Sequence, residues 1–260
     1  MGHSRIGTLP ATKRWDNVVE PLAQGADVPV VAGATLRAAE LAFAWVQEDA
    51  GFRTAAQLMT EIGLAAGAKD PVKALADLGI KLSETPSVPE VAVAVGDVLD
   101  KQLAAMRQGS DFGEMAGKAL VSAVVERLKD RLPTLIPATP EDVGAALKGV
   151  GRATGFGEFA RSFFSRLTNE TLGYFLTKIL GSKVGEGQRF ATNNQMATFL
   201  QGMKTHCDEA SVITEEFAGD WFSKHKYEEG GTISRKSIEG FAWYAMQKMR
   251  AELVARATNP

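Results

Sequence analysis

Residues 155–183 read GFGEFARSFFSRLTNETLGYFLTKILGSK, and their apolar side chains recur with the period of an α-helix. Before the polar segment LTNE at 167–170, the repeating residues are Phe156, Phe159, Phe163, Phe164 and Leu167. After it they are Leu172, Phe175, Leu176, Ile179 and Leu180. An apolar stripe of this kind predicts an amphipathic helix that packs on a core. Because LTNE interrupts the stripe, we expect two helices joined as a hairpin.

Three interpretations compete for this predicted hairpin. A helix-turn-helix DNA reader needs exposed polar and basic residues on its second helix, which offers little beyond Thr177 and Lys178. A membrane-surface helix would insert the phenylalanine-rich side, with Arg161 and Arg166 near the lipid headgroups. Burial against neighbouring helices explains the same pattern without a ligand. We therefore interpret the phenylalanines as core residues.

Helix start and stop signals recur along the rest of the chain. Asp70 and Thr139 each precede a proline, as is typical of an N-cap followed by the first helical turn. Thr192 and Gln195 are spaced as a capping box. Apolar stretches are followed by glycines suited to a left-handed helix end, namely Gly67, Gly109, Gly181 and Gly230. Strand signals are scarce, so the sequence predicts an all-α fold of about ten amphipathic helices in a compact, two-lobed bundle.

Two similar phrases, SDFGEMA at 110–116 and TGFGEFA at 154–160, each precede an apolar run. In the first, Asp111 can cap a helix while Glu114 reaches back to the free backbone N–H groups. In the second, Thr154 or Gly155 can cap, and a glutamate follows at the equivalent position. We expect shared capping chemistry to explain the resemblance better than an internal duplication does.

The distribution of aromatic residues suggests two lobes. Of the 20 aromatic residues, five lie in 1–150 and fifteen lie in 151–260, whereas the first part is rich in Ala and Val. Prolines that cannot continue a helix mark the seam at Pro133, Pro137 and Pro140. The sequence thus predicts an Ala/Val-rich helical lobe over 1–137 and an aromatic-rich helical lobe over 138–260, with one continuous domain as the alternative.

The overall composition narrows the class of protein. The apolar fraction is 45%, the charged fraction is 23% and the formal net charge is −2, as in an ordinary globular protein and unlike a strongly basic nucleic-acid binder. Cys207 is the single cysteine, so it cannot form an internal disulfide, and the N-terminal residues do not resemble a signal peptide. These features favour a cytoplasmic location.

The strongest candidate for catalysis or metal binding is THCDEA at 205–210. His206, Cys207 and Asp208 are consecutive, and consecutive helical residues point about 100° apart instead of converging on one ion. Cys207 with His206 or His225 as its base lacks an orienting third group, and a lone helical thiol is often a small core residue. GVGRATGFG at 149–157 lacks the strand that a dinucleotide loop requires. We therefore expect no metal and no cofactor, and the sequence favours a non-enzymatic protein while leaving thiol chemistry open.

The segment DWFSKHKYEEGGTISRK at 220–236 combines aromatic and basic side chains. They are Trp221, Phe222, Lys224, His225, Lys226, Tyr227, Arg235 and Lys236. Aromatic faces can stack on the bases of a single-stranded nucleic acid, and cations can bind its phosphates. The basic residues are equally favourable at a helix C-terminus, and the aromatic residues can pack in a core. Because aromatic residues dominate protein interfaces, we take this set as the candidate partner-binding site.

Together these observations predict a helical adaptor or accessory subunit that acts through contacts with another protein. Nucleic-acid binding by the basic and aromatic C-terminal lobe is the first alternative. Binding to a membrane surface is the second.

Overall fold

The computed structural model of the chain describes residues 3–4, 13–40, 46–106, 109–133 and 136–258. These parts are α-helical almost throughout, which confirms the all-α prediction. The helices are α1 (Lys13–Ala23), α2 (Val28–Ala38), α4 (Ala50–Ala66), α5 (Pro71–Asp77), α6 (Val88–Met106), α7 (Asp111–Leu128), α8 (Pro140–Leu147), α9 (Ala153–Leu180), α10 (Asn193–Ala210), α11 (Val212–Glu228) and α12 (Arg235–Thr258). Short 3₁₀ helices are η1 (Val46–Glu48), η2 (Lys148–Gly151) and η3 (Gly181–Lys183), and the strands β1 (His3–Ser4) and β2 (Gly109–Ser110) pair in parallel.

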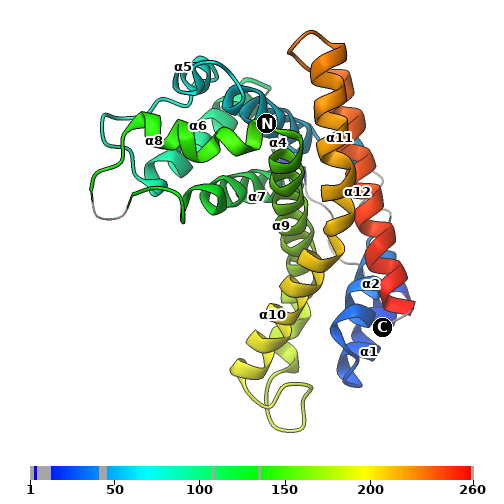
Figure 1. The fold of residues 1–260 in the computed structure, drawn as a ribbon. Helices are drawn as coiled ribbons and strands as arrows, with labels where there is room; N and C mark the ends of the chain where they lie inside the picture. The colour runs from blue at the N-terminus through cyan, green and yellow to red at the C-terminus, as the bar shows by residue number, and fades with distance from the viewer. Residues whose placement is uncertain (1–2, 5–12, 41–45, 107–108, 134–135, 259–260) are drawn as a thin grey trace.

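Helix α9 stands at the centre of the molecule (Figure 1). Helices α4 to α8 gather on one side of its N-terminal half, and α11 packs along that half from another side. Helix α10 folds back along the C-terminal half of α9. Helix α12 returns antiparallel to α11 and continues to α2, which packs in turn on α1. Every other layer of the fold is thus arranged around α9.

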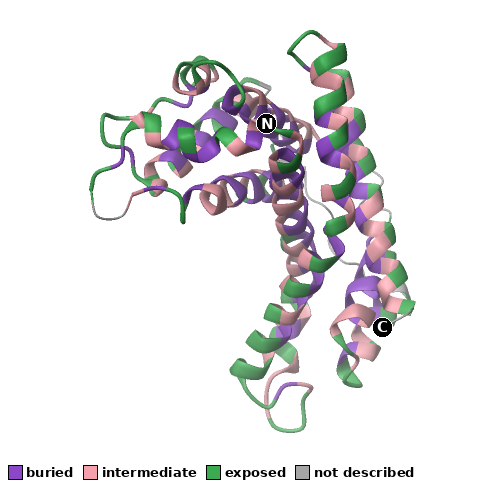
Figure 2. Ribbon diagram, in the orientation of Figure 1, coloured by how far each residue is buried: buried purple, intermediate pink, exposed green. Residues whose placement is uncertain are grey.

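The predicted hairpin over 155–183 is wrong, because these residues belong to one continuous helix up to Leu180. Thr168 of the polar interruption and Thr171 directly after it are buried, and the Thr171 hydroxyl donates to the Leu167 carbonyl at 2.7 Å. A threonine that bonds back to its own helix in this way needs no turn. The phenylalanines of the stripe are buried as expected, namely Phe156, Phe159, Phe163 and Phe164. Figure 2 shows buried residues along the length of α9.

Several predicted N-caps are confirmed. Asp70 accepts from the Lys73 backbone N–H at 2.9 Å, and Thr139 forms a reciprocal capping box with Asp142. Thr192 accepts from the Gln195 backbone N–H at 3.3 Å. These helices begin where the sequence predicts because a cap is a contact between residues three positions apart.

The repeated phrase does not reflect shared capping. The N-cap of α7 is Ser110, which accepts from the Gly113 N–H at 2.8 Å, so the cap lies one residue before the predicted Asp111. In the second phrase, Thr154 and Gly155 lie inside α9, whose N-terminal flanking residue is Arg152. The glutamate of the second phrase pairs with an arginine of α7 instead of reaching back.

Of the four predicted glycine stops, Gly230 alone has a left-handed backbone, with φ of 71°. Gly109 lies in β2, and Gly67 and Gly181 are right-handed, with φ of −89° and −58°. Gly67 lies in close contact with Gly151: a methyl group built on Gly151 would lie 2.3 Å from the Gly67 Cα, and one built on Gly67 would lie 3.1 Å from the Gly151 carbonyl oxygen. A close contact between two segments, and not a left-handed helix end, is thus the structural feature at Gly67.

Two further glycines allow α9 and α11 to pack closely against each other. A methyl group on Gly157 would lie 2.7 Å from the Glu215 carbonyl oxygen, and one on Gly219 would lie 2.5 Å from the Ala153 carbonyl oxygen. Beside this contact the rings of Phe156 and Phe222 stack at 4.1 Å. The surrounding core is a single cluster that includes residues from both predicted lobes, and the boundary at residue 137 stays a prediction.

Two glycine substitutions test the role of this contact. We expect Gly219→Ala to lower the free energy of unfolding by about 1–3 kcal/mol, because its methyl group would overlap a backbone carbonyl. Gly173→Ala, in the same kind of helical backbone on α9, would meet nothing within 4 Å and should raise stability by about 0.5–1 kcal/mol. Urea denaturation of both variants measures the difference. Equal shifts in the two would show that α9 and α11 do not depend on backbone contact.

Candidate functional site

The structure gathers part of the predicted contact set around a groove between α11 and α12. Trp221, Lys224, His225 and Lys236 line it together with residues that the sequence analysis did not select. The added residues are Phe217, Ser237, Gly240, Phe241 and Tyr244. The groove has a volume of about 740 Å³, within the range of ligand-binding clefts.

The floor of the groove is aromatic. The rings of Trp221 and Phe241 stack at 4.1 Å with an interplanar angle of 14°. Phe217 contacts Tyr244 edge-to-face at 5.1 Å, and Gly240 adds no side chain between them. Because these rings pack on one another across the two helices, the floor is rigid and offers ring faces and edges to a bound group.

The rim of the groove is cationic. Lys224 on α11 and Lys236 on α12 are exposed, and neither forms an ion pair with any residue that the structure describes. Lys248 lies one turn beyond, with its ammonium 5.4 Å from the centre of the Tyr244 ring. None of the residues that line the groove is acidic. An anionic group would therefore meet two uncompensated positive charges above an apolar floor.

The other predicted contact residues do not line the groove. Phe222 is 1% exposed and stacks on Phe156, so a partner cannot reach it in the folded protein, which corrects its assignment as a contact residue. Lys226 lies with its ammonium 5.6 Å from the centre of the Phe222 ring. Tyr227 is 89% exposed, and Arg235 is paired with Glu239 at 2.9 Å. The alternating sequence pattern spreads over several faces because α11 turns by about 100° per residue.

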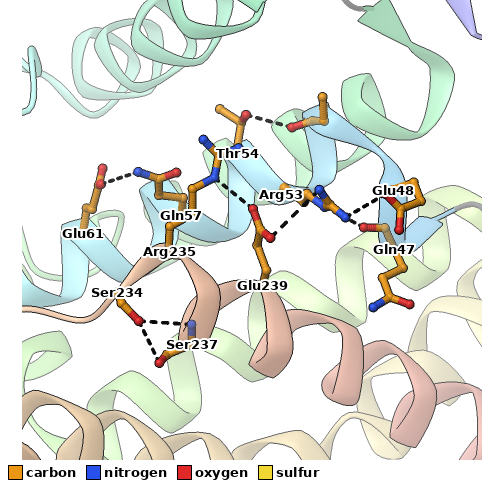
Figure 3. A network of polar contacts seen from close by, with 11 residues as sticks. Gln47, Glu48, Arg53, Thr54, Gln57, Glu61, Ser234, Arg235, Ser237 and Glu239 are labelled. Carbon is orange, nitrogen blue, oxygen red and sulfur yellow. Dashed lines mark hydrogen bonds and ion pairs between the residues drawn. The ribbon is translucent and has the colours of Figure 1, made fainter. Parts of the chain in front are cut away.

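A network of polar contacts holds the N-terminus of α12 beside the groove. Figure 3 shows Glu239 between Arg235 and Arg53, an arginine of α4 whose Nη1 lies 3.9 Å from the Glu239 carboxylate. Arg53 also donates to Glu48 at 3.1 Å, and the hydroxyls of Ser234 and Ser237 lie 2.9 Å apart. The contact between Arg53 and Glu239 ties the beginning of α12 to α4.

Glu229 connects the end of α11 to the start of α12. Its carboxylate accepts from the Ser234 backbone N–H at 2.6 Å and from the Ser237 hydroxyl at 2.9 Å, and it lies 2.9 Å from His225 Nδ1. The Ser234 N–H, followed by His225 and Ser237, lowers the pKa of Glu229 to about 2. Gly230, with its left-handed backbone, allows the chain to turn between the helices. The groove is therefore held closed at this end by one ionised carboxylate.

Sequence reasoning missed half of the groove because its two walls are separate segments. Phe217 and Trp221 are spaced i, i+4 on α11, and Phe241 and Tyr244 are spaced i, i+3 on α12. Each pair is visible as an aromatic spacing, but only the antiparallel packing of the helices brings them together. Trp221 is the residue common to both the sequence prediction and the floor.

A second, strongly polar pocket lies where α7, α9, α10 and α11 meet, with a volume of about 440 Å³. Its lining residues are Glu126, Arg127, Glu158, Arg161, Ser162, Ser165, Arg166, Lys204, Asp208, Ser211 and Glu215. The α9 members, from Glu158 to Arg166, recur at i, i+3, i+4, i+7 and i+8. This polar stripe was visible in the sequence opposite the phenylalanine stripe, but we had interpreted only the apolar one.

Ion pairs cross between the helices of this polar pocket. Arg127 binds Glu158 at 2.6 Å, and Arg161 donates to the Glu215 carboxylate at 2.8 Å. Glu126 accepts from Arg166 at 3.0 Å and from the Ser162 hydroxyl. Burial raises the pKa of Glu126, but these two donors outweigh it and leave that pKa below its ordinary value. These ion pairs therefore connect α7, α9 and α11 around the pocket.

The thiol hypothesis is not supported by the geometry. Cys207 is buried, and burial followed by the nearby Asp208 raises the pKa of its thiol to about 12. His206 is also buried, its Nε2 has no hydrogen-bond partner in the protein, and burial together with Arg256 lowers its pKa. A thiol that keeps its proton cannot act as a nucleophile at neutral pH. Among the described residues, no group of three His, Cys, Asp or Glu side chains could hold a metal ion.

Comparison with family models, with curated proteins and with solved structures finds no match. None of the helices in the described ranges combines the length and apolar character needed to cross a bilayer.

Cys207 should be unreactive in the folded protein. We expect no labelling by a maleimide at pH 7, because the thiol is buried and protonated, and rapid labelling after denaturation. Mass spectrometry at both conditions makes the comparison. Fast modification of the native protein would show that the helix carrying Cys207 opens readily.

Glu229 should make the junction between α11 and α12 sensitive to acid. Its pKa falls from 4.5 to about 2 on folding, so the stabilisation is complete above about pH 4.5 and is lost as the pH drops toward 2. We expect Glu229→Gln to lower stability at pH 7 and to flatten the loss of stability between these two values. Chemical denaturation across pH measures this, with the exposed neighbour Glu228→Gln as the matched control. An unchanged pH profile in Glu229→Gln would contradict the role of this carboxylate.

Proposed function

We propose that the protein is a helical adaptor that holds a segment of another protein in the groove between α11 and α12. The observation that supports this is the combination of a stacked aromatic floor, centred on Trp221 and Phe241, with the unpaired ammonium groups of Lys224 and Lys236 on opposite helices. Aromatic anchors in a preformed cleft provide most of the energy at protein interfaces, and rim charges select the partner.

The chemistry of the groove specifies the segment that it would accept. An apolar or aromatic side chain would fill the space over the floor, and acidic residues on either side of that anchor would approach Lys224 and Lys236. An acidic lining would repel such flanks, but the groove has none. The partner is thus expected to present an acidic segment with a central hydrophobic anchor.

Gly240 supports a binding role for the groove. A glycine inside a helix costs about 0.5–1 kcal/mol relative to alanine. Packing does not require it, because a methyl group at Gly240 would meet nothing within 4 Å. Its effect in the structure is to leave the floor of the groove open between Phe241 and Lys236.

Protein binding accounts for the charges better than nucleic-acid binding does. A nucleic acid requires several cations along a phosphate backbone, whereas the groove offers two unpaired lysines and exposed acidic residues lie on the same helix at Glu216 and Asp220. The membrane-surface alternative relied on the phenylalanine-rich side of α9, whose rings lie in the core. A reducing compartment such as the cytoplasm remains our proposal for the location, because Cys207 is a free thiol.

The full-length protein can be tested against a displayed library of random peptides. We expect enrichment of peptides with an aromatic or large aliphatic residue flanked by Asp or Glu. Gly240→Leu should abolish their binding by filling the groove, whereas Gly173→Leu, another open helical glycine, should leave binding unchanged. Lys224→Glu and Lys236→Glu should each weaken binding about tenfold or more, with Lys69→Glu, at an exposed residue that does not line the groove, as the charge control.

The competing outcomes of this experiment are distinct. Enrichment of peptides without acidic residues, or binding that survives Gly240→Leu, would overturn the assignment of the groove. Binding of an oligothymidine that falls steeply with salt and is lost in Lys224→Glu would replace it with single-stranded nucleic-acid binding.

A further inference from the structure

We propose that the polar pocket between α7, α9, α10 and α11 binds a small zwitterion of the α-amino acid class. In this arrangement the ammonium group of Lys204 receives the ligand carboxylate and the carboxylate of Asp208 receives the ligand ammonium. Both side chains come from α10 and line the pocket of about 440 Å³. The site is separate from the groove between α11 and α12.

The charges of the lining residues lead to this class of ligand. Four cations and four carboxylates face the pocket, so it has no net preference for an anion or a cation. Three of the cations, all of them arginines, form ion pairs with three of the carboxylates across helix boundaries. The charges left without a counter-ion in the described structure are Lys204 and Asp208. One unpaired charge of each sign is complementary to a molecule that carries both.

Lys204 and Asp208 would be expected to neutralise each other, because they are spaced i, i+4 on one helix. Pairs with the same spacing and order do form elsewhere, at Lys73–Asp77 and Arg235–Glu239. On α10 no such ion pair forms, because the Asp208 carboxylate is turned toward α9, where it accepts from the Ser165 hydroxyl. The backbone at the same position is also held, since Arg161 donates to the Asp208 carbonyl at 3.2 Å. Contacts with α9 thus keep the two charges apart.

The walls of the pocket are suited to holding a ligand in one orientation. The ion pairs Arg127–Glu158, Arg161–Glu215 and Arg166–Glu126 join different helices and fix the shape of the pocket without using Lys204 or Asp208. A volume of about 440 Å³ lies in the size range of small-molecule sites. Charge-assisted hydrogen bonds inside such a partly enclosed pocket are about twice as strong as neutral ones. The pocket therefore has room, rigid walls and two free charged groups.

Isothermal titration of the full chain with each of the twenty free L-amino acids tests the proposal. We expect at least one to bind with a Kd below about 1 mM. For the amino acid that binds, the N-acetyl derivative and the amide each lack one of the two charges. Each should bind about 10- to 100-fold more weakly, the usual effect of losing a hydrogen bond to a charged group.

Two variants test which charged group of the ligand each of the two side chains binds. Lys204→Met should weaken the amino acid about 10- to 100-fold and make it bind no better than its amide. Asp208→Asn should weaken it similarly and make it bind no better than its N-acetyl derivative. Lys204 forms no ion pair or hydrogen bond in the described structure, so its replacement leaves the fold intact and gives a decisive result even if Asp208→Asn is unstable. Lys69→Met is the control on an exposed loop.

Two results would overturn the proposal. One is the absence of binding by every amino acid at about 10 mM, far above a functional Kd. The other is binding that survives Lys204→Met with its preference for the free carboxylate unchanged. Gly240→Leu should leave amino-acid binding intact, so that failure of the groove and failure of this pocket are told apart.

Discussion

The structure depends on the contact of two helix backbones at Gly157 of α9 and Gly219 of α11. Because neither residue has a side chain, the helices approach until a methyl group on either one would overlap a carbonyl of the other helix. At this distance Phe156 and Phe222 stack face to face and are shielded from water. The contact fixes the rotation of α11 about its axis. That rotation decides which residues of α11 face the core, the groove and the polar pocket.

Helix α9 can occupy the centre of the fold because its apolar side is buried in the core and the charges on its polar side are paired. Its phenylalanine side is buried in the core, where apolar area removed from water stabilises the fold. Its polar side, with Arg161 and Arg166, would be costly to cover if the charges were unpaired. Instead each arginine meets a carboxylate on a neighbouring helix, at Glu215 and Glu126. Ion pairs of this kind add little net stability but penalise alternative registers of the helices, which would separate the charges.

Features that depend on neighbouring residues were predictable from the sequence, and features that depend on packing were not. Thr139 caps α8 as predicted because the cap and its partner lie within one turn. The continuity of α9 through LTNE was not predictable, because the burial of Thr168 within that segment depends on helices distant in sequence. Gly67 has the sequence pattern of a left-handed helix end, but its backbone is right-handed and it lies in close contact with Gly151. Trp221 predicted one wall of the groove. The other wall could not be predicted, because the sequence does not show that α12 packs beside α11.

Helix α11 contributes residues to both candidate sites, from different sides of the helix. Successive residues turn by about 100°, so Phe217, Trp221 and Lys224 fall within about 60° of each other on the side away from Glu215, Gly219 and Phe222. The first set faces the groove, whereas the second set lies along α9 and reaches the polar pocket through Glu215. The groove floor also touches α9, because the ring of Trp221 lies 6.2 Å from that of Phe156, whereas Lys224 lies on the exposed rim. Because the two sets of residues lie on different sides of α11, the proposed protein-docking groove and the proposed small-molecule pocket use different side chains of the same helix.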